Sequence, residues 1–140
     1  MTTAQTTPSG LTQASVTSDI LARAQAHGLV LSADSATVDE TGWDFLVVQA
    51  TAVDGTPWIL RVPRRPPVVK AAMAEAKLIA TLRGRLPVAV PDFRIVTPDL
   101  IAYPRLAGEP AGAGNPRTGP LTWCIDPANP PEALVRALGR

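Results

Sequence analysis

The amino-acid sequence predicts an α+β fold, in which an antiparallel sheet of about five strands packs on one long helix, with an extra helix at the N-terminal end. Three observations lead to this prediction. Two apolar segments flank an Asp-Gly turn, which indicates a hairpin. A run rich in Ala, Leu, Lys and Glu follows, as is typical of a helix. Hydrophobic residues make up 46% of the 140 residues, enough for the core of one domain or of part of a larger one.

The N-terminal region predicts a polar tail followed by a short helix. Residues Met1–Thr17 are mainly Thr, Ser, Gln and Ala, so we expect them to be flexible. Ser18 is a suitable N-cap, and the acidic residue after it favours the first helical turn. Apolar residues then repeat at helical spacing, and Gly28 can adopt the left-handed conformation that ends a helix. The sequence therefore predicts a helix over Asp19–His27.

Strands are expected next, because β-branched and aromatic residues dominate the following segments. Asp54-Gly55 is a strong signal for a turn between two of them. Pro63 should end the second strand of that hairpin, since proline cannot donate a hydrogen bond to a ladder. The strands expected before the long helix are, in chain order, Leu29–Leu31, Ala36–Asp39, Trp43–Thr51 and Trp58–Val62.

The long helix is predicted over Val68–Arg83, with Gly84 as its stop. Two further strands, Phe93–Val96 and Leu100–Tyr103, are expected on either side of a turn at Thr97-Pro98-Asp99. The order of elements is thus helix, strands, hairpin, helix and two strands. Such an order favours an antiparallel sheet with helices packed on it over an alternating parallel arrangement.

The composition changes after the last of these strands. Residues Ala107–Pro131 are rich in Gly, Pro and Ala without clear elements, which is typical of a linker or a functional loop. Asn129 as a cap then indicates a helix over Pro130–Leu138. Because its apolar stripe has nothing after it to pack on, we expect a chain truncated inside a larger protein. The expected organisation is a flexible tail at 1–17, a folded unit at 18–106, and a hinge or linker with the start of a second unit at 107–140.

Charge and composition exclude several classes of function. A formal net charge of +1 gives little attraction to a polyphosphate backbone, so no nucleic-acid partner is expected. One cysteine and one histidine, Cys124 and His27, cannot form a zinc site of the Cys/His type, and no metal ligands are assigned. No apolar run is long enough to span a bilayer, and no export signal is visible. We therefore expect a cytoplasmic protein without a membrane partner.

Two residues dominate the functional interpretation. On the strand Trp58–Val62, Arg61 and Ile59 share one face. On the long helix, every residue three, four or seven positions from Glu75 is apolar, which places Glu75 in the stripe that should face the sheet. A carboxylate there should find a cation, and Arg61 is the obvious partner. The alternative is that Glu75 lies on the margin of the stripe and is half solvated.

A basic strand residue paired with a helix glutamate is a known device for holding nucleotide phosphates. The segment Asp39–Trp43 would cover those phosphates, although it has one glycine and could equally be an ordinary hairpin turn. The segment Ile101–Pro110 could bind a base through backbone groups. In that register Tyr103 is a gatekeeper, Pro104 offers its C=O, and Leu106 offers C=O and N–H. A plain strand and turn is the alternative.

Other conspicuous residues have structural interpretations. Trp43 and Trp58 flank the hairpin and are expected to pack in the core or across strands. Arg64, Arg65 and Lys70 form a small basic patch, for which a solvated surface is favoured over ligand contact. Cys124 is assigned no reactivity.

The chain resembles the N-terminal lobe of the aminoglycoside phosphotransferase-like kinases, and within them the macrolide 2′-phosphotransferases. The match covers roughly Asp19 to Tyr103. The residues that carry it are Ala26-His27-Gly28-Leu29, Thr37-Val38-Asp39-Glu40-Thr41-Gly42-Trp43-Asp44, Trp58-Ile59-Leu60-Arg61-Val62-Pro63-Arg64-Arg65, Glu75-Ala76, Arg85-Leu86-Pro87-Val88-Ala89-Val90-Pro91-Asp92-Phe93-Arg94 and Ala102-Tyr103-Pro104.

This resemblance implies a kinase-like N-terminal lobe of an antibiotic kinase that confers macrolide resistance. The enzyme would transfer the γ-phosphate of GTP, with ATP as the alternative donor, to the 2′-hydroxyl of a macrolide amino sugar. By motif position Arg61 is the phosphate-binding cation and Glu75 its partner. The residues implied to bind the nucleotide are Arg61, Glu75, Val38, Thr41, Phe45, Ile59, Tyr103, Pro104 and Leu106.

The catalytic base of the family lies in a His-Gly-Asp-type loop and its metal ligand further on, and neither motif occurs here. No catalytic residue is therefore assigned, Mg²⁺ would be held mainly by a second lobe, and this chain alone is not expected to catalyse transfer. An aminoglycoside or other small-molecule kinase of the same fold, and a non-catalytic α+β interaction module, are the alternatives.

Overall fold

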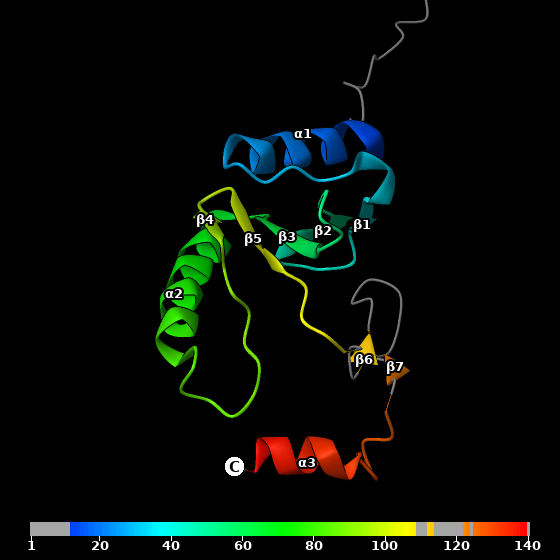
Figure 1. Ribbon diagram of the computed structural model, residues 1–140, viewed down its shortest axis with the longest axis vertical. Coiled ribbons are helices and arrows are strands. Elements are labelled where there is room, and N and C mark those ends of the chain that lie inside the picture. Colours follow the sequence, from blue (N-terminus) through cyan, green and yellow to red (C-terminus); the bar gives the residue numbers. More distant parts are fainter. Residues whose placement is uncertain (1–11, 109–111, 114–121, 124, 140) are drawn as a thin grey trace, which may run out of the picture.

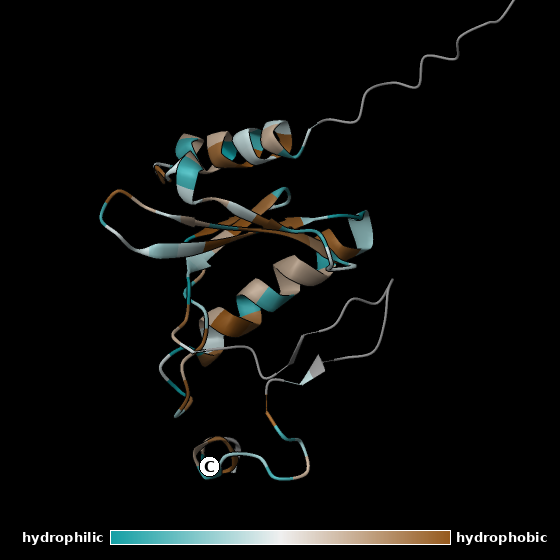
Figure 2. Cartoon of the chain, turned by 90° about the vertical axis from the view of Figure 1, so that its right-hand side faces the viewer, coloured by the Kyte–Doolittle hydropathy of each residue, from teal (hydrophilic) through white to brown (hydrophobic). Residues whose placement is uncertain are grey.

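The computed structural model describes residues 12–108, 112–113, 122–123 and 125–139 (Figure 1). Its main feature is a five-stranded antiparallel sheet with the strand order β1-β2-β3-β5-β4. Helix α1 (Gln13–Ala26) covers one face of this sheet and helix α2 (Pro66–Leu82) covers the other (Figure 2). The predicted α+β class and the five antiparallel strands are confirmed.

Helix α1 begins earlier than the sequence predicts. Thr12, not Ser18, is the N-cap, and its hydroxyl accepts a hydrogen bond from the N–H of Ser15 at 3.4 Å. The longer helix adds Val16 to the apolar stripe that packs on the core, which is the physical reason for the extension. Residues 13–17 of the expected tail are thus helical, and 1–11 lie outside the described residues. The end is as predicted, with Gly28 at φ 84°.

The segment after α1 differs from the prediction. The expected strand Leu29–Leu31 is wrong, because only Leu31 forms a bridge, to Ala52. A 3₁₀ turn, η1 (Ala33–Ser35), follows and was not predicted. The hydroxyl of Ser35 accepts a hydrogen bond from the N–H of Thr51 at 2.8 Å, so this turn takes up a backbone donor at the end of a strand.

The predicted hairpin is present. Strands β1 (Thr37–Asp39), β2 (Phe45–Thr51) and β3 (Pro57–Pro63) pair in sequence, and Thr51 faces Pro57 where the hairpin turns. Gly55 takes φ 87° in that turn, which a side chain would disfavour. Strand β2 starts at Phe45, not at Trp43 as predicted.

Helix α2 starts at Pro66, two residues before the predicted start, because proline suits the first helical turn. Strands β4 (Ile95–Thr97) and β5 (Leu100–Pro104) follow it as the predicted pair, joined at the predicted turn. Strand β5 inserts between β3 and β4, so β3 lies in the middle of the sheet. This central position puts the two faces of β3 under different helices.

The main apolar core lies between α1 and the sheet. Val48, Leu60 and Ala102 lie side by side on three adjacent strands, and each is fully buried. Ile20 and Ala24 of α1 pack on them. Burying a side chain such as Leu60 contributes about 2 kcal/mol of transfer free energy. The sequence predicts the long helix as the main partner of the sheet, whereas this larger core forms under the N-terminal helix.

The opposite face is covered by α2 through small residues. Its buried side chains, Val68, Ala72 and Ala76, recur every fourth residue. Ile101 of β5 is fully buried and lies opposite Arg61 in the ladder, so it belongs to this face. The alanines allow the helix to come close to the sheet without filling the space beside it.

The part of the chain after residue 104 contains a two-stranded pair and a short helix. Strand β6 (Gly112–Ala113) pairs with β7 (Thr122–Trp123), and neither strand was predicted. Helix α3 (Glu132–Leu138) is predicted, but its N-cap is Pro131 and not Asn129. Cys124 and the rest of the expected linker at 109–111 and 114–121 lie outside the described residues. The division of the chain at residue 106 stays a prediction.

None of the helices in the described part of the chain is both long and apolar enough to cross a membrane.

Candidate functional site

The predicted pair of Arg61 and Glu75 is formed. Arg61 Nη1 donates to Glu75 Oε1 at 3.1 Å and Nη2 donates to Oε2 at 3.3 Å. This is the fork-to-fork geometry in which a guanidinium binds both oxygens of one carboxylate. The Arg61 side chain is 17% exposed and that of Glu75 is 40% exposed. The pair thus joins β3 to α2 at the edge of the buried zone.

The predicted depth of Glu75 is wrong, and the alternative of a residue on the margin describes its position. Ala72 and Ala76 face the sheet, and Glu75 lies beside that row. Leu78, which the apolar pattern places in the same stripe, is 57% exposed. Because water reaches the carboxylate, Glu75 pays no full burial cost, yet it still reaches Arg61. Glu75 therefore lies at the margin of the apolar stripe and still forms the predicted ion pair with Arg61.

Phe45 makes a second contact with the same guanidinium. The Arg61 Cζ atom lies 3.9 Å from the centre of the Phe45 ring. The ladder explains this contact, because Phe45 lies opposite Pro63, two residues from Arg61 on the same face of β3. A cation over an aromatic face is attracted by the ring electrons. Arg61 is held by a ring on one side and by a carboxylate at its tip.

These residues line a groove of about 560 Å³ between the sheet and the start of α2. It is lined by Asp44, Phe45, Arg61, Arg65, Pro67, Val68, Ala71, Ala72 and Glu75. Two cations and two anions therefore border it, and they pair as Arg61 with Glu75 and Arg65 with Asp44. Phe45 from β2 and apolar side chains from α2 supply the rest of the lining.

The loop between β1 and β2 lies beside this groove and has its own internal support. Asp39 Oδ1 accepts hydrogen bonds from the Thr41 N–H at 2.8 Å and from the Thr41 hydroxyl at 2.5 Å. These bonds, the hydroxyl one first, hold the pKa of the Asp39 carboxyl below its ordinary value. At Gly42 a Cβ atom would lie 2.7 Å from the carbonyl oxygen of Phe45, so this position has no room for a side chain.

Two arginines after β3 hold the other side of this loop. Arg64 donates from its backbone N–H to the carbonyl of Asp44 at 2.9 Å, and from Nη2 to the carbonyl of Glu40 at 3.0 Å. Arg65 forms an ion pair with the Asp44 carboxylate. The sequence interpretation as a solvated basic patch missed this role for both residues. The signal was available in the hairpin register, which brings the end of β3 to the start of β2.

The end of β5 lies on the far side of β3 from that loop. Tyr103 lies opposite Ile59, and its ring centre is 5.1 Å from that of Phe93. Burial raises the pKa of the Tyr103 phenol above its ordinary value. After β5 the N–H of Arg105 donates to the carbonyl of Pro57 at 2.8 Å. Leu106, next along the chain, is 39% exposed.

The structure brings most of the predicted site residues to one face of the sheet. The ladder register places Phe45, Ile59, Arg61 and Tyr103 on the α2 face, where Glu75 joins them. Thr41 lies in the adjoining loop, while Pro104 and Leu106 lie at and beyond the end of β5.

Val38 is the exception among the predicted site residues. It lies opposite Val48 in the ladder and packs on the core under α1. Its neighbour Asp39 lies opposite Val47, in the row that includes Arg61, and is the β1 residue on the site face. The assignment of Val38 to this site is therefore corrected, because side chains alternate along a strand.

The prediction that both tryptophans pack in the core or across strands is wrong for Trp43 and correct for Trp58. Trp43 is 62% exposed because it lies in the loop before β2 and not in a strand. Trp58 is partly buried and packs against the core under α1.

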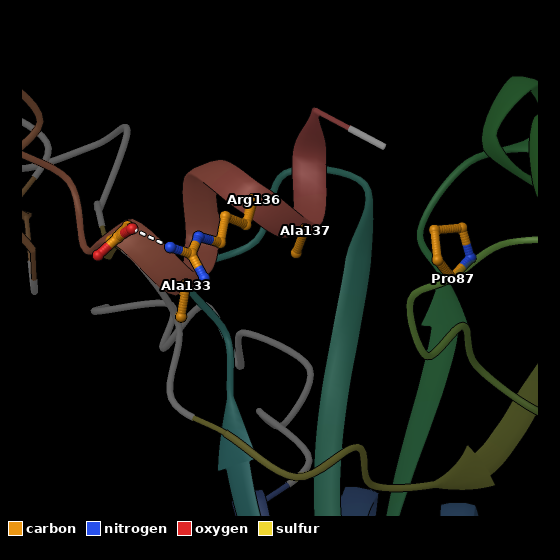
Figure 3. Close-up of a pocket in the computed structure, with 5 residues that line it drawn as sticks. Pro87, Ala133, Arg136 and Ala137 are labelled. Carbon is orange, nitrogen blue, oxygen red and sulfur yellow. Dashed lines mark hydrogen bonds and ion pairs between the residues drawn. The ribbon is translucent and has the colours of Figure 1, made fainter.

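A second pocket lies beside helix α3 and has little chemistry to offer. It has a volume of about 390 Å³ and is lined by Pro87, Glu132, Ala133, Arg136 and Ala137 (Figure 3). Its two charged residues, Glu132 and Arg136, form an ion pair one helical turn apart. Among the described residues no group of three or more His, Cys, Asp or Glu side chains could hold a metal ion. Of these two pockets, the groove beside Arg61 is the one that brings the predicted site residues together, and we take it as the candidate functional site.

No protein-family model matches the chain. A protein from Bacillus subtilis (strain 168), described as uncharacterized protein YcbJ, is 41% identical over 128 residues, which are 91% of this chain and 42% of that protein.

Two similar structures carry a functional description. The crystal structure of the macrolide 2′-phosphotransferase MphH from Brachybacterium faecium, an apoenzyme, is 44% identical with a TM-score of 0.71, covering 78% of this chain and 36% of that one. A type I macrolide 2′-phosphotransferase is 39% identical with a TM-score of 0.66, covering 84% of this chain and 38% of that one. The chain thus spans between 36% and 42% of the length of these relatives.

These structures confirm the resemblance to macrolide 2′-phosphotransferases that the sequence predicted. The five-stranded antiparallel sheet with its helices has the fold of the kinase-like N-terminal lobe of those enzymes.

Proposed function

We propose that this chain is the nucleotide-binding lobe of a macrolide 2′-phosphotransferase. The intact enzyme transfers the γ-phosphate of GTP to the 2′-hydroxyl of the macrolide amino sugar, and so confers macrolide resistance in the cytoplasm. The similarity to two macrolide 2′-phosphotransferases supports the substrate class. GTP as the donor comes from the resemblance of the sequence to that group of enzymes.

One observation supports this proposal most strongly, the bidentate pair of Arg61 and Glu75 at the wall of the groove. Phosphoryl transfer depends on positioning and on neutralising the charge of the phosphates. Arg61 supplies a cation that remains charged at any physiological pH. Glu75 fixes the direction of that cation, so little is lost in ordering the side chain when a triphosphate binds.

The neighbouring elements have matching roles in the proposal. The loop from Glu40 to Asp44 covers the phosphates, and Arg64 and Arg65 hold it to the end of β3. The base lies beyond Tyr103, where the backbone groups of Pro104 and Leu106 are available to hydrogen-bond its edge. Ile59 and Tyr103 supply the apolar surface beneath it.

Mg²⁺, which phosphoryl transfer requires, does not fit a site built from the described residues alone, since they contain no suitable cluster of acidic side chains. In the proposal its ligands and the catalytic base belong to the second lobe of the intact enzyme.

The proposal is tested by measuring phosphate transfer by the intact enzyme with panels of nucleotides and of hydroxyl acceptors. Transfer from GTP to macrolides, abolished or strongly reduced in Arg61→Ala, supports the proposal. Arg85→Ala is the matched control, because Arg85 is an exposed arginine outside the groove. Transfer to an aminoglycoside instead of a macrolide would favour the related small-molecule kinases. Absence of both transfer and nucleotide binding would contradict the kinase assignment and favour an interaction module.

A further inference from the structure

The guanidinium of Arg61 has more hydrogen-bond donors than Glu75 uses. An arginine side chain carries five N–H donors in one plane. Glu75 accepts from Nη1 and Nη2, which means that the carboxylate occupies the tip of the fork. The side edge, formed by the Nε–H and the outer N–H of the adjacent Nη, donates no hydrogen bond to Glu75. A planar cation can thus bind one carboxylate at its tip and a second oxyanion along its side.

A planar donor set helps only if the plane itself is held. The bond to Glu75 fixes the tip of the guanidinium, but rotation about that axis would swing the side edge away. Phe45 restricts this rotation, because the Arg61 Cζ atom lies over its ring, 3.9 Å from the ring centre. The backbone that carries this ring is held in the sheet, because Phe45 is the first residue of β2 and pairs with Pro63 in the ladder. Phe45 and Arg61 both line the groove.

We propose that Phe45 is a positioning residue that holds the Arg61 guanidinium so that its side edge stays available for two phosphate oxygens while Glu75 occupies its tip. This inference rests on the proposed function and assigns Phe45 a role through Arg61 in place of the direct nucleotide contact implied by sequence resemblance. It also predicts that lysine cannot replace arginine at position 61. An ammonium group has no face to stack in this way and no second edge to offer.

The direct readout is the NMR signal of the Arg61 Nε–H in the intact enzyme without nucleotide. A ring stacked on the guanidinium shifts this proton signal upfield and slows its exchange with water. We expect both effects in the wild type and in Phe45→Tyr, and we expect Phe45→Leu to lose them. Phe93→Leu is the matched control, since it removes the chain's other phenylalanine, which contacts Tyr103 and not Arg61.

Nucleotide affinity, measured by calorimetry with GTP, is the second readout. Phe45→Leu keeps an apolar side chain, and we expect it to bind about three- to tenfold more weakly, in line with the usual strength of a cation–aromatic contact. Phe45→Tyr should restore wild-type affinity. Arg61→Lys leaves Phe45 in place and should also bind GTP more weakly than the wild type. This variant tests the need for a planar cation even if Phe45→Leu proves unstable.

The outcomes separate this inference from the proposed function. If Arg61→Ala weakens GTP binding while Phe45→Leu binds as tightly as the wild type, the role of Phe45 is rejected and the proposed function stands. Wild-type affinity in Arg61→Lys would equally reject the need for a planar fork. If the wild type binds no nucleoside triphosphate, the proposed function fails, and the inference fails with it.

Discussion

The two faces of strand β3 have different compositions and different consequences. Leu60 points into the core under α1 and is fully buried, with apolar neighbours on both adjacent strands. Arg61, the next residue, points to the opposite face, where it contacts Phe45 and a carboxylate on α2. Alternation along a single strand therefore separates the residues that stabilise the fold from those that offer a binding site.

This difference extends to the two helices. Helix α1 contributes Ile20 and Ala24 to a continuous apolar cluster. Helix α2 contacts the sheet mainly through small residues, and a groove of about 560 Å³ remains at its start. A face packed tightly by apolar side chains has little space for a ligand, whereas a face covered by alanines leaves room beside the helix. Substitutions on the two faces should consequently affect different measurements.

The largest effect is expected on the α1 face. Leu60→Ala should lower the free energy of unfolding by about 2–5 kcal/mol, because it leaves a cavity in a fully buried cluster. Chemical denaturation followed by circular dichroism would measure the change. Val53→Ala, at a position 86% exposed, is the control and should change stability by less than about 0.5 kcal/mol. Equal losses in both variants would contradict the assignment of the main core to this face.

Substitution of Arg61, the next residue along β3, should affect nucleotide binding more than stability. Arg61→Ala should lower the free energy of unfolding by only about 1 kcal/mol, because its partner Glu75 is 40% exposed and water can replace the lost pair. The same variant should weaken nucleotide binding by about 10- to 100-fold, as expected for charge-assisted hydrogen bonds to a phosphate. Denaturation and calorimetry on the same samples would test both halves. A stability loss as large as that of Leu60→Ala would remove the contrast between the faces.

The smallest effect concerns the loop beside the groove. Because its carboxyl pKa is lowered in the folded protein, Asp39 contributes stability that is present above its unfolded pKa and is lost as the pH falls through the folded pKa. Thr41→Val removes the hydroxyl bond, so the pKa of Asp39 should rise toward its ordinary value. Titration of the carboxyl signals by NMR would measure this shift.

The control for this titration is within the same chain. Hydrogen bonds from Thr56, first of all from its backbone N–H, lower the pKa of Asp54, and they are untouched by Thr41→Val. A rise at Asp39 alone would confirm that the loop is supported locally. An unchanged Asp39, or equal shifts at both residues, would show that the hydroxyl of Thr41 is not the main cause.

Most of the features that the sequence predicted correctly depend on local patterns. The hairpin follows from the Asp-Gly turn, and the opposite faces of Leu60 and Arg61 follow from the period of two in a strand. The end of α1 at Gly28 follows from the conformational freedom of glycine. The pair of Arg61 and Glu75 could be predicted because the long helix must return over the preceding hairpin.

The features that were missed depend on how elements meet. The rotation of α2 about its axis places Ala72 and Ala76 against the sheet and exposes Leu78, and this rotation is set by close approach and not by hydrophobicity alone. Val38 was assigned to the site by resemblance, and a three-residue strand gives no periodic signal that would show its face. Its position becomes clear only through its partner Val48.

The anchoring of the loop by Arg64 and Arg65 was missed for a related reason. Two consecutive arginines after a strand are most often solvated, and their composition alone gives no partner. The partners, Glu40 and Asp44, are about twenty residues away in the chain and are brought close only by the register of the hairpin.

The central claim is that Arg61, held by Glu75 on the α2 face, binds the phosphates of a nucleotide. The most direct measurement is a crystal structure of the intact enzyme with a non-hydrolysable GTP analogue. We predict a phosphate oxygen about 3 Å from Arg61 Nε or Nη, with the bonds to Glu75 retained. A triphosphate bound elsewhere, with Arg61 still paired to Glu75 and no phosphate within reach, would contradict the account.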